Sequence, residues 1–471
     1  MNTKLEKFKN TIKGKKVGVI GIGISNIPAI KYLASMGAKV TALDKRETLD
    51  IPIEDLENSG VQFVLGENYL SNLNGFDYIL RSPGVKPFTP ELEKAVNSGA
   101  KLTSEIELLM ELAPCKIIGV TGSDGKTTTT TLISMFLKEA GFNVWLGGNI
   151  GTPLFSKLGE MKDTDIIVLE LSSFQLMTAK KSPDISVVTN ISPNHLDYHR
   201  SYDEYIEAKE NIFLRESNQT VVFNTDDGMT EKFLKDIEKT KISKSVKYFS
   251  LNKMEKIGCF FKDGFIYYNN GKTIETIESK ENIRLVGMHN IANICAAASA
   301  VIELTGIEAI VRVITTFNGV KHRMQHIATI NGVKWYNDSI GTSPSRTMAG
   351  LNSFDKKIIL IAGGYDKHIP YDVLGEPILN KVKHLVLLGA TAPKIEKAVI
   401  DAAEELNKNY TEFLTITNCN SLEECVSYCS TIASEGDIVV MSPASASFDM
   451  YKNFEQRGEH FCSLVNNLKD A

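Results

Sequence analysis

The chain has 471 residues, too many for one hydrophobic core, and this length predicts about three domains. Its 43% hydrophobic and 23% charged residues are an ordinary globular composition. The 52 Lys and Arg against 57 Asp and Glu give a formal net charge of −5 without long runs of one sign, which excludes a strongly basic protein that binds nucleic acid or acidic membranes.

The sequence also indicates where the protein works. Seven cysteines, an odd number in a long chain, do not make a secreted disulfide framework. The charged start MNTKLEKFKNTIKGKK lacks the apolar core of a signal peptide, and no apolar stretch approaches the roughly 18 residues that span a bilayer. We therefore expect a reduced, cytoplasmic protein, a monomer with no membrane and no nucleic-acid partner.

Apolar stretches of strand length alternate with helical patterns from end to end, which is typical of an α/β protein with mainly parallel sheets. The pattern resets near SEIELLMELAPCK and again near FNGVKHR. We expect a Rossmann-like N-terminal domain over residues 1–105, a central P-loop ATPase-type domain over 106–319, and a C-terminal Rossmann-like α/β domain over 320–471.

The first domain begins with a strand, KKVGVIGIG, then a helix over SNIPAIKYLASMG and a second strand, AKVTALD. Gly21 and Gly23 are spaced as in a dinucleotide-binding loop, but Asn26 stands where the third glycine belongs. Asp44 ends the second strand, where an acid can bind a ribose. NAD and another nucleotide both remain open as ligands, although no constellation for hydride transfer supports a dehydrogenase.

The central domain opens with the strand IIGVT, the turn GSDG and the helix KTTTTTLISMFLKEAG, the context of a phosphate-binding loop. The usual pattern has glycine where Val120 stands, and here the glycine is Gly122. Lys126 would reach the β- and γ-phosphates, and Thr127 would offer its hydroxyl to Mg²⁺. A tight turn with a solvent-facing lysine is the plainer interpretation, but five consecutive threonines are a poor helix start for stability alone.

Two further features lie after strands of this domain. Glu170 ends the strand DIIVLE, where a carboxylate could complete the Mg²⁺ coordination, although such a residue is usually a solvated loop charge. His195 and His199 are four residues apart, but without a third ligand they do not indicate a zinc site. The loops GGNIGTP and TNISPNHLDYH also follow strands.

Lys209 falls in the middle of an apolar stripe on the helix YDEYIEAKENIF. A lysine on such a face ordinarily extends its amine to water. Alternatively, a partly buried amine has a lowered pKa, is more often neutral, and can react with CO₂ to give a carbamate that binds metal.

The remaining segments carry fewer signals. Asn290 and Asn293 lie on one face of a predicted helix, suited to an adenine edge or to capping. Strands of the last domain, KIILIAGG, HLVLLGA and DIVVMSPAS, each end in small residues, as ligand-binding loops of an open sheet do. The cysteines in its C-x5-C-x3-C segment, 419–429, lack a CxxC pair and are expected to be plain thiols.

The segment T-G-x-x-G-K-T at 121–127, with ELSSFQL at 170–176 and GMHNIAN at 287–293, resembles the Mur ligase family, and the resemblance covers essentially the whole chain. It implies an ATP-dependent acid–amino-acid ligase that uses two Mg²⁺ ions. The implied catalytic residues are Lys126, His195 and Lys209, with Lys209 as a carbamate. The implied metal ligands are Thr127, Glu170, His195 and carbamylated Lys209.

The resemblance also implies binding residues for three substrates. ATP is expected to contact Gly122, Ser123, Asp124, Gly125, Lys126, Thr127, Thr128, Asn290, Asn293, Arg323 and Asp338. A UDP-sugar is expected to contact Ile24, Ser25, Asp44, Arg46, Ser82, Gly84, Asn149, Ser172 and His195. An amino acid is expected to contact Lys367, Ser447 and Phe454.

The last block, SPASASFDMYKNFEQRG, is similar to that of the member that adds D-glutamate to UDP-N-acetylmuramoyl-L-alanine through an acyl phosphate, a step of peptidoglycan precursor synthesis. Some members have lysine where Ile340 stands, which leaves one charge contact to the substrate open. Another amino-acid ligase of the family, or a nucleotide-switched binding protein, are the alternatives.

Overall fold

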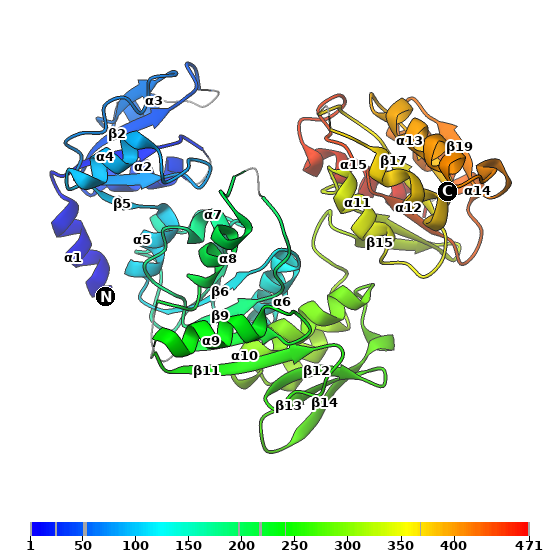
Figure 1. Ribbon diagram of the computed structural model, residues 1–471, viewed down its shortest axis with the longest axis horizontal. Coiled ribbons are helices and arrows are strands. Elements are labelled where there is room, and N and C mark those ends of the chain that lie inside the picture. The colour runs from blue at the N-terminus through cyan, green and yellow to red at the C-terminus, as the bar shows by residue number, and fades with distance from the viewer. Residues whose placement is uncertain are drawn as a thin grey trace. The chain divides into compact units, whose positions relative to one another are not determined.

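The computed structural model describes residues 2–23, 26–49, 54–195, 198–215, 219–240, 242–367 and 369–469. The chain divides into two compact units, one of Met1–Asn282 with His289–Thr315 and the other of Ile283–Met288 with Thr316–Ala471. The first unit contains two β-sheets and the second contains one (Figure 1). All three are mainly parallel, which confirms the α/β class, while the domain boundaries stay predictions.

The N-terminal sheet is parallel throughout and has the order β3-β2-β1-β4-β5. Its strands are β1 (Lys16–Ile20), β2 (Lys39–Asp44), β3 (Gln62–Leu65), β4 (Tyr78–Arg81) and β5 (Lys101–Thr103). The helices are α1 (Thr3–Ile12), α2 (Asn26–Ser35), α3 (Glu54–Glu57), α4 (Pro90–Asn97) and α5 (Glu105–Leu112). Since β1 lies between β2 and β4, the strand order reverses there, and the carboxyl ends of β1 and β4 border the place where ligands bind in such sheets.

The central sheet has the order β14-β13-β12-β11-β10-β9-β6-β8-β7. Its strands are β6 (Lys116–Thr121), β7 (Val144–Gly148), β8 (Ile166–Glu170), β9 (Ile185–Val188), β10 (Gln219–Asn224), β11 (Lys244–Ser250), β12 (Gly258–Lys262), β13 (Phe265–Asn269) and β14 (Ile274–Ser279). Strands β12 to β14 pair antiparallel with one another, and the other pairs are parallel. The helices are α6 (Lys126–Glu139), α7 (Ser173–Leu176), α8 (Tyr202–Glu210), α9 (Thr230–Thr240) and α10 (Met288–Ile314).

Helix α10 corrects one expectation from the sequence. It contains an 18-residue window of mean hydropathy 1.8, so by length and composition it could cross a membrane. However, 61% of that window is buried inside the protein. The Ser299 hydroxyl accepts a hydrogen bond from Cys259 N of β12 at 2.8 Å and lies 3.1 Å from the Tyr248 carbonyl of β11. The apolar length is therefore used for packing against the central sheet.

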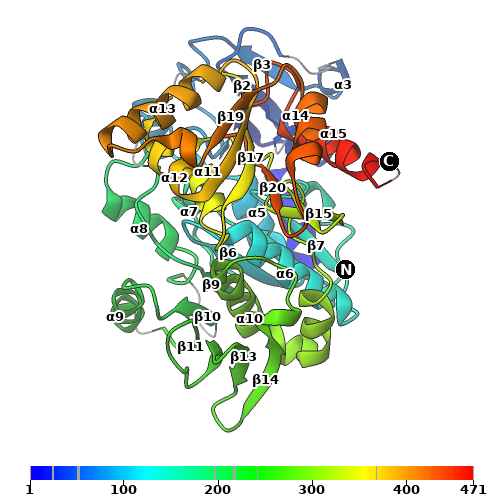
Figure 2. The ribbon, with the colours of Figure 1, turned by 90° about the vertical axis from the view of Figure 1, so that its right-hand side faces the viewer.

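The C-terminal sheet has the order β15-β16-β20-β17-β18-β19, with only β15 and β16 antiparallel. Its strands are β15 (Gln325–Ile330), β16 (Val333–Asn337), β17 (Ile358–Ala362), β18 (Val382–Leu387), β19 (Thr415–Asn418) and β20 (Ile438–Met441). Helices α11 (Pro344–Leu351), α12 (Gly375–Lys381) and α13 (Ala392–Glu405) cover one face, and α14 (Leu422–Ile432) and α15 (Phe454–Asn467) cover the other (Figure 2). Successive residues of β17 alternate between the two cores, as strand geometry requires.

Candidate active site

The phosphate-loop sequence forms a tight turn between the end of β6 and the start of α6. Gly125 is the N-cap of α6 with φ of 80°, and Gly122 has φ of 147°, conformations that favour glycine. A Cβ on Gly122 would lie 1.9 Å from the Thr189 hydroxyl, and one on Gly125 would lie 2.2 Å from Asn293 Oδ1. Val120 is inside β6, where a glycine is not needed. The displaced glycine thus follows from where this loop turns.

Asn190, which follows β9, holds the phosphate loop in place through hydrogen bonds. Its carbonyl accepts from Ser123 N at 2.8 Å, and its Oδ1 accepts from Asp124 N at 2.9 Å. The Ser123 hydroxyl also bonds the Tyr205 hydroxyl of α8 at 2.8 Å. Because these two amides are already used, phosphate oxygens would bind to the N–H groups of the first turn of α6, which have no partner within the helix.

Lys126 and Thr127 lie at the start of α6 beside a buried carboxylate. Lys126 Nζ donates to the carbonyl of Gly122 at 2.9 Å, so the amine folds over the loop. Thr127 Oγ1 donates to Glu170 Oε2 at 2.7 Å, and Asn149 Nδ2 donates to Glu170 Oε1 at 2.8 Å. Glu170 is therefore no solvated loop charge, since only 1% of it is exposed.

This arrangement fits a magnesium ion. The buried Glu170 side chain receives these two hydrogen bonds from neutral donors, and carboxylate and hydroxyl oxygens are the ligands that Mg²⁺ prefers. Within the described ranges, no group of three or more His, Cys, Asp and Glu side chains could hold a metal alone. Phosphate and water oxygens would therefore complete the coordination beside Thr127 and Glu170.

The Lys209 amine does not extend to water, so the ordinary interpretation of a lysine on an apolar helix face is wrong here. Its side chain is buried, and Nζ donates to the Gly122 carbonyl at 2.7 Å and to Thr121 Oγ1 at 3.2 Å. Burial first, and the nearby charge of Lys126 second, lower the pKa of the Lys209 amine well below 10.5. The amine lies directly under the phosphate loop, and a lowered pKa is what the carbamate hypothesis requires.

The two histidines of TNISPNHLDYH have different surroundings. His195 is exposed, has φ of 54°, and its ring packs edge-on against Phe174 with centroids 4.9 Å apart. His199 is buried, and its Nε2 lies 2.9 Å from the Ser173 hydroxyl. Ser172 is the N-cap of α7 in a reciprocal capping box. His195 is thus the exposed histidine of the two.

Asn290 and Asn293 of α10 also reach the loop. Asn293 Oδ1 accepts from the Thr129 hydroxyl at 3.3 Å, and Asn293 Nδ2 donates to Asn290 Oδ1 at 3.2 Å. Both side chains are buried. Asn293 lies against the turn at Gly125, beside the place expected for the nucleotide.

In the N-terminal domain, Asp44 orients Arg46 and the glycine loop. Its Oδ2 accepts from Ile22 N at 2.7 Å, and its Oδ1 accepts from Arg46 Nε at 2.9 Å. The Arg46 side chain is the main reason that the Asp44 pKa is lowered to about 2. Asn26 replaces the third glycine because its amide donates to the Gly21 carbonyl at 2.8 Å.

Two other residues predicted to contact the UDP-sugar lie in the turn after β4. Ser82 and Gly84 belong to a turn closed by Val85 N donating to the Ser82 carbonyl at 3.0 Å. Ser82 packs closely against Gly21, where an added Cβ would be 2.8 Å away. Ile24 and Ser25 lie outside the described residues.

Asp338 and Arg323 lie close together in the C-terminal unit. Asp338 Oδ2 accepts from Ser442 Oγ at 2.6 Å, and Oδ1 accepts from Met324 N at 3.2 Å. Burial raises the Asp338 pKa to about 6, although the positive charge of Arg323 opposes this. Ile340 stands where some members of the resembled family have lysine. Arg346 Nη1 donates to the Ile340 carbonyl at 3.1 Å, so a guanidinium lies beside this position.

The residues predicted to hold the amino acid lie on two loops of this unit that meet. Tyr365 N, two residues before Lys367, donates to the Ala446 carbonyl at 2.9 Å, and Ser447 follows directly. Burial, and the charges of Arg346 and Arg457, lower the pKa of Lys367. Phe454, half-buried, begins α15. The cluster of cations suits an anionic amino acid.

Four residues that position these sites were not singled out from the sequence: Arg81, Asn190, Tyr205 and Arg457. Arg457 is buried and donates to Ala446, Ser445 and Ser339. Tyr205 could be counted only as part of the apolar stripe, and Asn190 only as part of a loop. A polar group buried by tertiary contacts leaves no periodic signal in the sequence.

Comparison with known proteins gives three matching family models. They are the Mur ligase MurD-like N-terminal domain over residues 15–104, the Mur ligase middle domain over 120–301, and the Mur ligase glutamate ligase domain over 322–445.

Curated relatives match from end to end. A UDP-N-acetylmuramoylalanine--D-glutamate ligase of Acetivibrio thermocellus is 51% identical over 100% of both chains, and one of Ruminiclostridium cellulolyticum is 49% identical with the same coverage. A relative of that name from Clostridium botulinum is 48% identical over 99% of this chain and 100% of its own.

Solved structures share the fold. A UDP-N-acetylmuramate-alanine ligase from Thermotoga maritima superposes with a TM-score of 0.57 at 17% identity, covering 96% of this chain and 99% of that one. A pseudomurein peptide ligase from Methanothermus fervidus gives a TM-score of 0.55 at 19% identity, covering 97% and 100%.

Proposed function

The chain belongs to the Mur ligase family, and from this premise we propose that it joins D-glutamate to UDP-N-acetylmuramoyl-L-alanine at the expense of ATP, a cytoplasmic step of peptidoglycan precursor synthesis. One observation carries the proposal. A glycine-capped phosphate loop lies beside the buried Glu170 and above the buried Lys209, in a chain about half identical, over its full length, to ligases of that name.

The first step makes a good leaving group. A carboxylate oxygen of the L-alanyl group attacks the γ-phosphorus of ATP, the bond from that phosphorus to the β–γ bridging oxygen breaks, and ADP leaves. Lys126 and the N–H groups at the start of α6 stabilise the negative charge on the transferred phosphoryl group. The place of Lys126 Nζ across the loop, at the Gly122 and Ser123 carbonyls, supports this role.

The second step forms the amide. The D-glutamate amine attacks the acyl carbon, the C–O bond to the phosphate breaks, inorganic phosphate leaves, and the amine nitrogen loses a proton. The proposed binding site of the D-glutamate carboxylates consists of the cations Lys367 and Arg457 with Ser447 and Phe454. The unshielded acyl phosphate must be kept from water, which would otherwise hydrolyse it.

Two Mg²⁺ ions would neutralise phosphate charge when bound. Thr127 and Glu170 are the proposed ligands of one, and His195 with carbamylated Lys209 the proposed ligands of the other. In its neutral form the buried Lys209 amine would add its nitrogen to the carbon of CO₂ and release one proton, which gives a carbamate anion. The position under Gly122 supports this assignment.

The proposed binding of the UDP-sugar uses the N-terminal domain, with Asp44 and Arg46 at the loop after β2 and Ser82 and Gly84 at the turn after β4. We propose that the chain works as a monomer without membrane attachment. Gel filtration of the purified protein checks the oligomeric state, and its distribution between the soluble and membrane fractions of lysed cells checks the attachment.

An assay of amino-acid-dependent ADP release tests the function. With ATP, Mg²⁺ and UDP-N-acetylmuramoyl-L-alanine, ADP should appear on addition of D-glutamate and not of L-glutamate, L-alanine or a diamino acid. Release with another amino acid would assign the chain to a different ligation. ADP release that needs no amino acid would favour a nucleotide-switched protein.

A further inference from the structure

Arg81 is a buried cation at the end of β4 that the mechanism above does not use. It is 1% exposed, and burial lowers its pKa. Its Nη1 donates to the Val85 carbonyl at 2.6 Å, and its Nη2 donates to the Phe174 carbonyl at 2.9 Å. The acceptors described for it are carbonyl and hydroxyl oxygens, and its Nε is buried without a partner among the described residues. An apolar side chain would be cheaper to bury, so stability alone does not explain this arginine.

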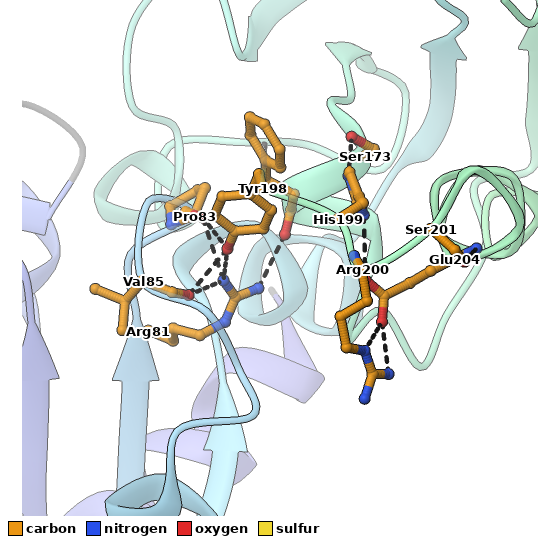
Figure 3. A network of polar contacts seen from close by, with 10 residues as sticks. Arg81, Pro83, Val85, Ser173, Tyr198, His199, Arg200, Ser201 and Glu204 are labelled. Carbon is orange, nitrogen blue, oxygen red and sulfur yellow. Dashed lines mark hydrogen bonds and ion pairs between the residues drawn. The ribbon is translucent and has the colours of Figure 1, made fainter. Parts of the chain in front are cut away.

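The guanidinium joins two sheets of the first unit. Val85 belongs to the turn after β4 of the N-terminal sheet, whereas Phe174 belongs to α7, which follows β8 of the central sheet. Tyr198 completes the connection, because its hydroxyl bonds the Pro83 carbonyl at 2.8 Å and lies 3.5 Å from Arg81 Nη1 (Figure 3). A planar fork of donors reaches both partners at once, which a lysine cannot do.

Residues predicted to contact the substrate lie on both sides of the Arg81 guanidinium. On one side, the clamped turn contains Ser82 and Gly84. On the other side, the Phe174 ring packs against Tyr198 with centroids 4.2 Å apart and against His195 at 4.9 Å. His195 has φ of 54°, a strained conformation for a residue other than glycine, which persists only when its surroundings hold it.

We infer that Arg81 is a positioning residue of the UDP-sugar site: its guanidinium holds the Ser82–Val85 turn against Phe174 and Tyr198, and thereby keeps Ser82, Gly84 and His195 in register for one substrate. This inference rests on the proposed function. It assigns Arg81 no contact with the reacting atoms.

Calorimetric titration of the purified full-length chain tests it without turnover. Arg81→Lys, which keeps the charge and loses the fork, should weaken the affinity for UDP-N-acetylmuramoyl-L-alanine about 10-fold to 100-fold, the usual effect of losing a group that orients a ligand-binding residue. The affinity for ATP should fall clearly less, because Ser82 and Gly84 are not expected to contact ATP and only His195 is also a proposed Mg²⁺ ligand. Tyr198→Phe should shift the UDP-sugar affinity in the same direction by less.

A matched control is Arg312→Lys, since Arg312 lies in the same unit, has a 57% exposed side chain and pairs with Glu139. It should leave both affinities unchanged. A folded Arg81→Lys variant with wild-type affinity for the UDP-sugar would overturn the inference. An equal loss of affinity for the UDP-sugar and for ATP would overturn it as well. If Arg81→Lys does not fold, the UDP-sugar affinity of Tyr198→Phe decides. Wild-type protein that binds the UDP-sugar but shows no D-glutamate-dependent ADP would instead sink the proposed function alone.

Discussion

Burial distinguishes the ionisable side chains of this site from ordinary surface charges. Lys209 and Glu170 would both be solvated surface charges if the sequence pattern alone decided, yet both are buried within a few ångströms of the phosphate loop. Burial lowers the pKa of the Lys209 amine, which favours its neutral form, whereas the buried Glu170 carboxyl group accepts hydrogen bonds from Thr127 and Asn149. We propose that the two groups have complementary tasks around the phosphates of ATP.

Replacing Lys209 tests the carbamate. Lys209→Ala should lower kcat about 100-fold or more, because a charge-stabilising group is lost from the site. Short carboxylates such as acetate should restore part of the rate by replacing the carbamate in the space left by the side chain. Lys235→Ala, at an exposed lysine of α9, is the control. Full activity of Lys209→Ala without additive would show that the lysine is structural.

Asp338 predicts a pH dependence of stability. Its carboxyl pKa is raised from 3.8 to about 6 by burial, so its contribution is fully present below pH 3.8 and is lost as pH rises through about 6. From about pH 4 to pH 7, wild type should lose about 2 kcal/mol of unfolding free energy relative to Asp338→Asn, which cannot ionise. Urea unfolding followed by Trp335 fluorescence in a Trp145→Phe background measures this, and a constant difference would contradict the shift.

At the scale of elements, the start of α6 is defined by what surrounds it. Gly125 has a left-handed conformation and faces Asn293 of α10, whereas Gly141, after the end of the same helix, is left-handed with nothing within 4 Å of an added Cβ. Substitutions at the two positions therefore distinguish two effects. Both strain the backbone, but only the one at Gly125 also causes a collision with a neighbouring side chain.

Gly125→Ala should lower kcat/KM for ATP about 100-fold, because the added methyl group displaces the turn that presents the helix N-terminus to phosphate. Gly141→Ala should cost about 1 kcal/mol of stability and leave kinetics unchanged. Steady-state kinetics with thermal melting compares them. Equal kinetic effects would mean that helix strain, and not the position of the loop, controls nucleotide use.

Elements with a strong local pattern were predictable. The strand, turn and helix from 117 to 139 and the buried strands ending at Glu170 and Ala362 follow from apolar runs and glycine. The short strands β5 and β19, and the hairpin of β15 and β16, have mixed polarity and were not anticipated. Their pairing comes from neighbours distant in sequence, which a local pattern does not contain.

At the scale of the whole chain, the sequence was sufficient for the α/β class and for the family, because glycine-dependent loops and their spacing are local. It could not provide the contacts that join elements, such as Asn190 to the phosphate loop or Arg81 to α7. Nor could it foresee that α10, apolar enough for a membrane, is mostly buried in the protein. Such facts depend on which segments meet, and so on the fold itself.

The central claim is that the loop from Gly122 to Thr128 holds the triphosphate that activates the substrate carboxylate. The most direct measurement compares Lys126→Ala with wild type for D-glutamate-dependent ADP release and, by calorimetry, for UDP-N-acetylmuramoyl-L-alanine binding. We predict that Lys126→Ala releases no measurable ADP and binds the UDP-sugar as wild type does. ADP release by Lys126→Ala at the wild-type rate would contradict the account.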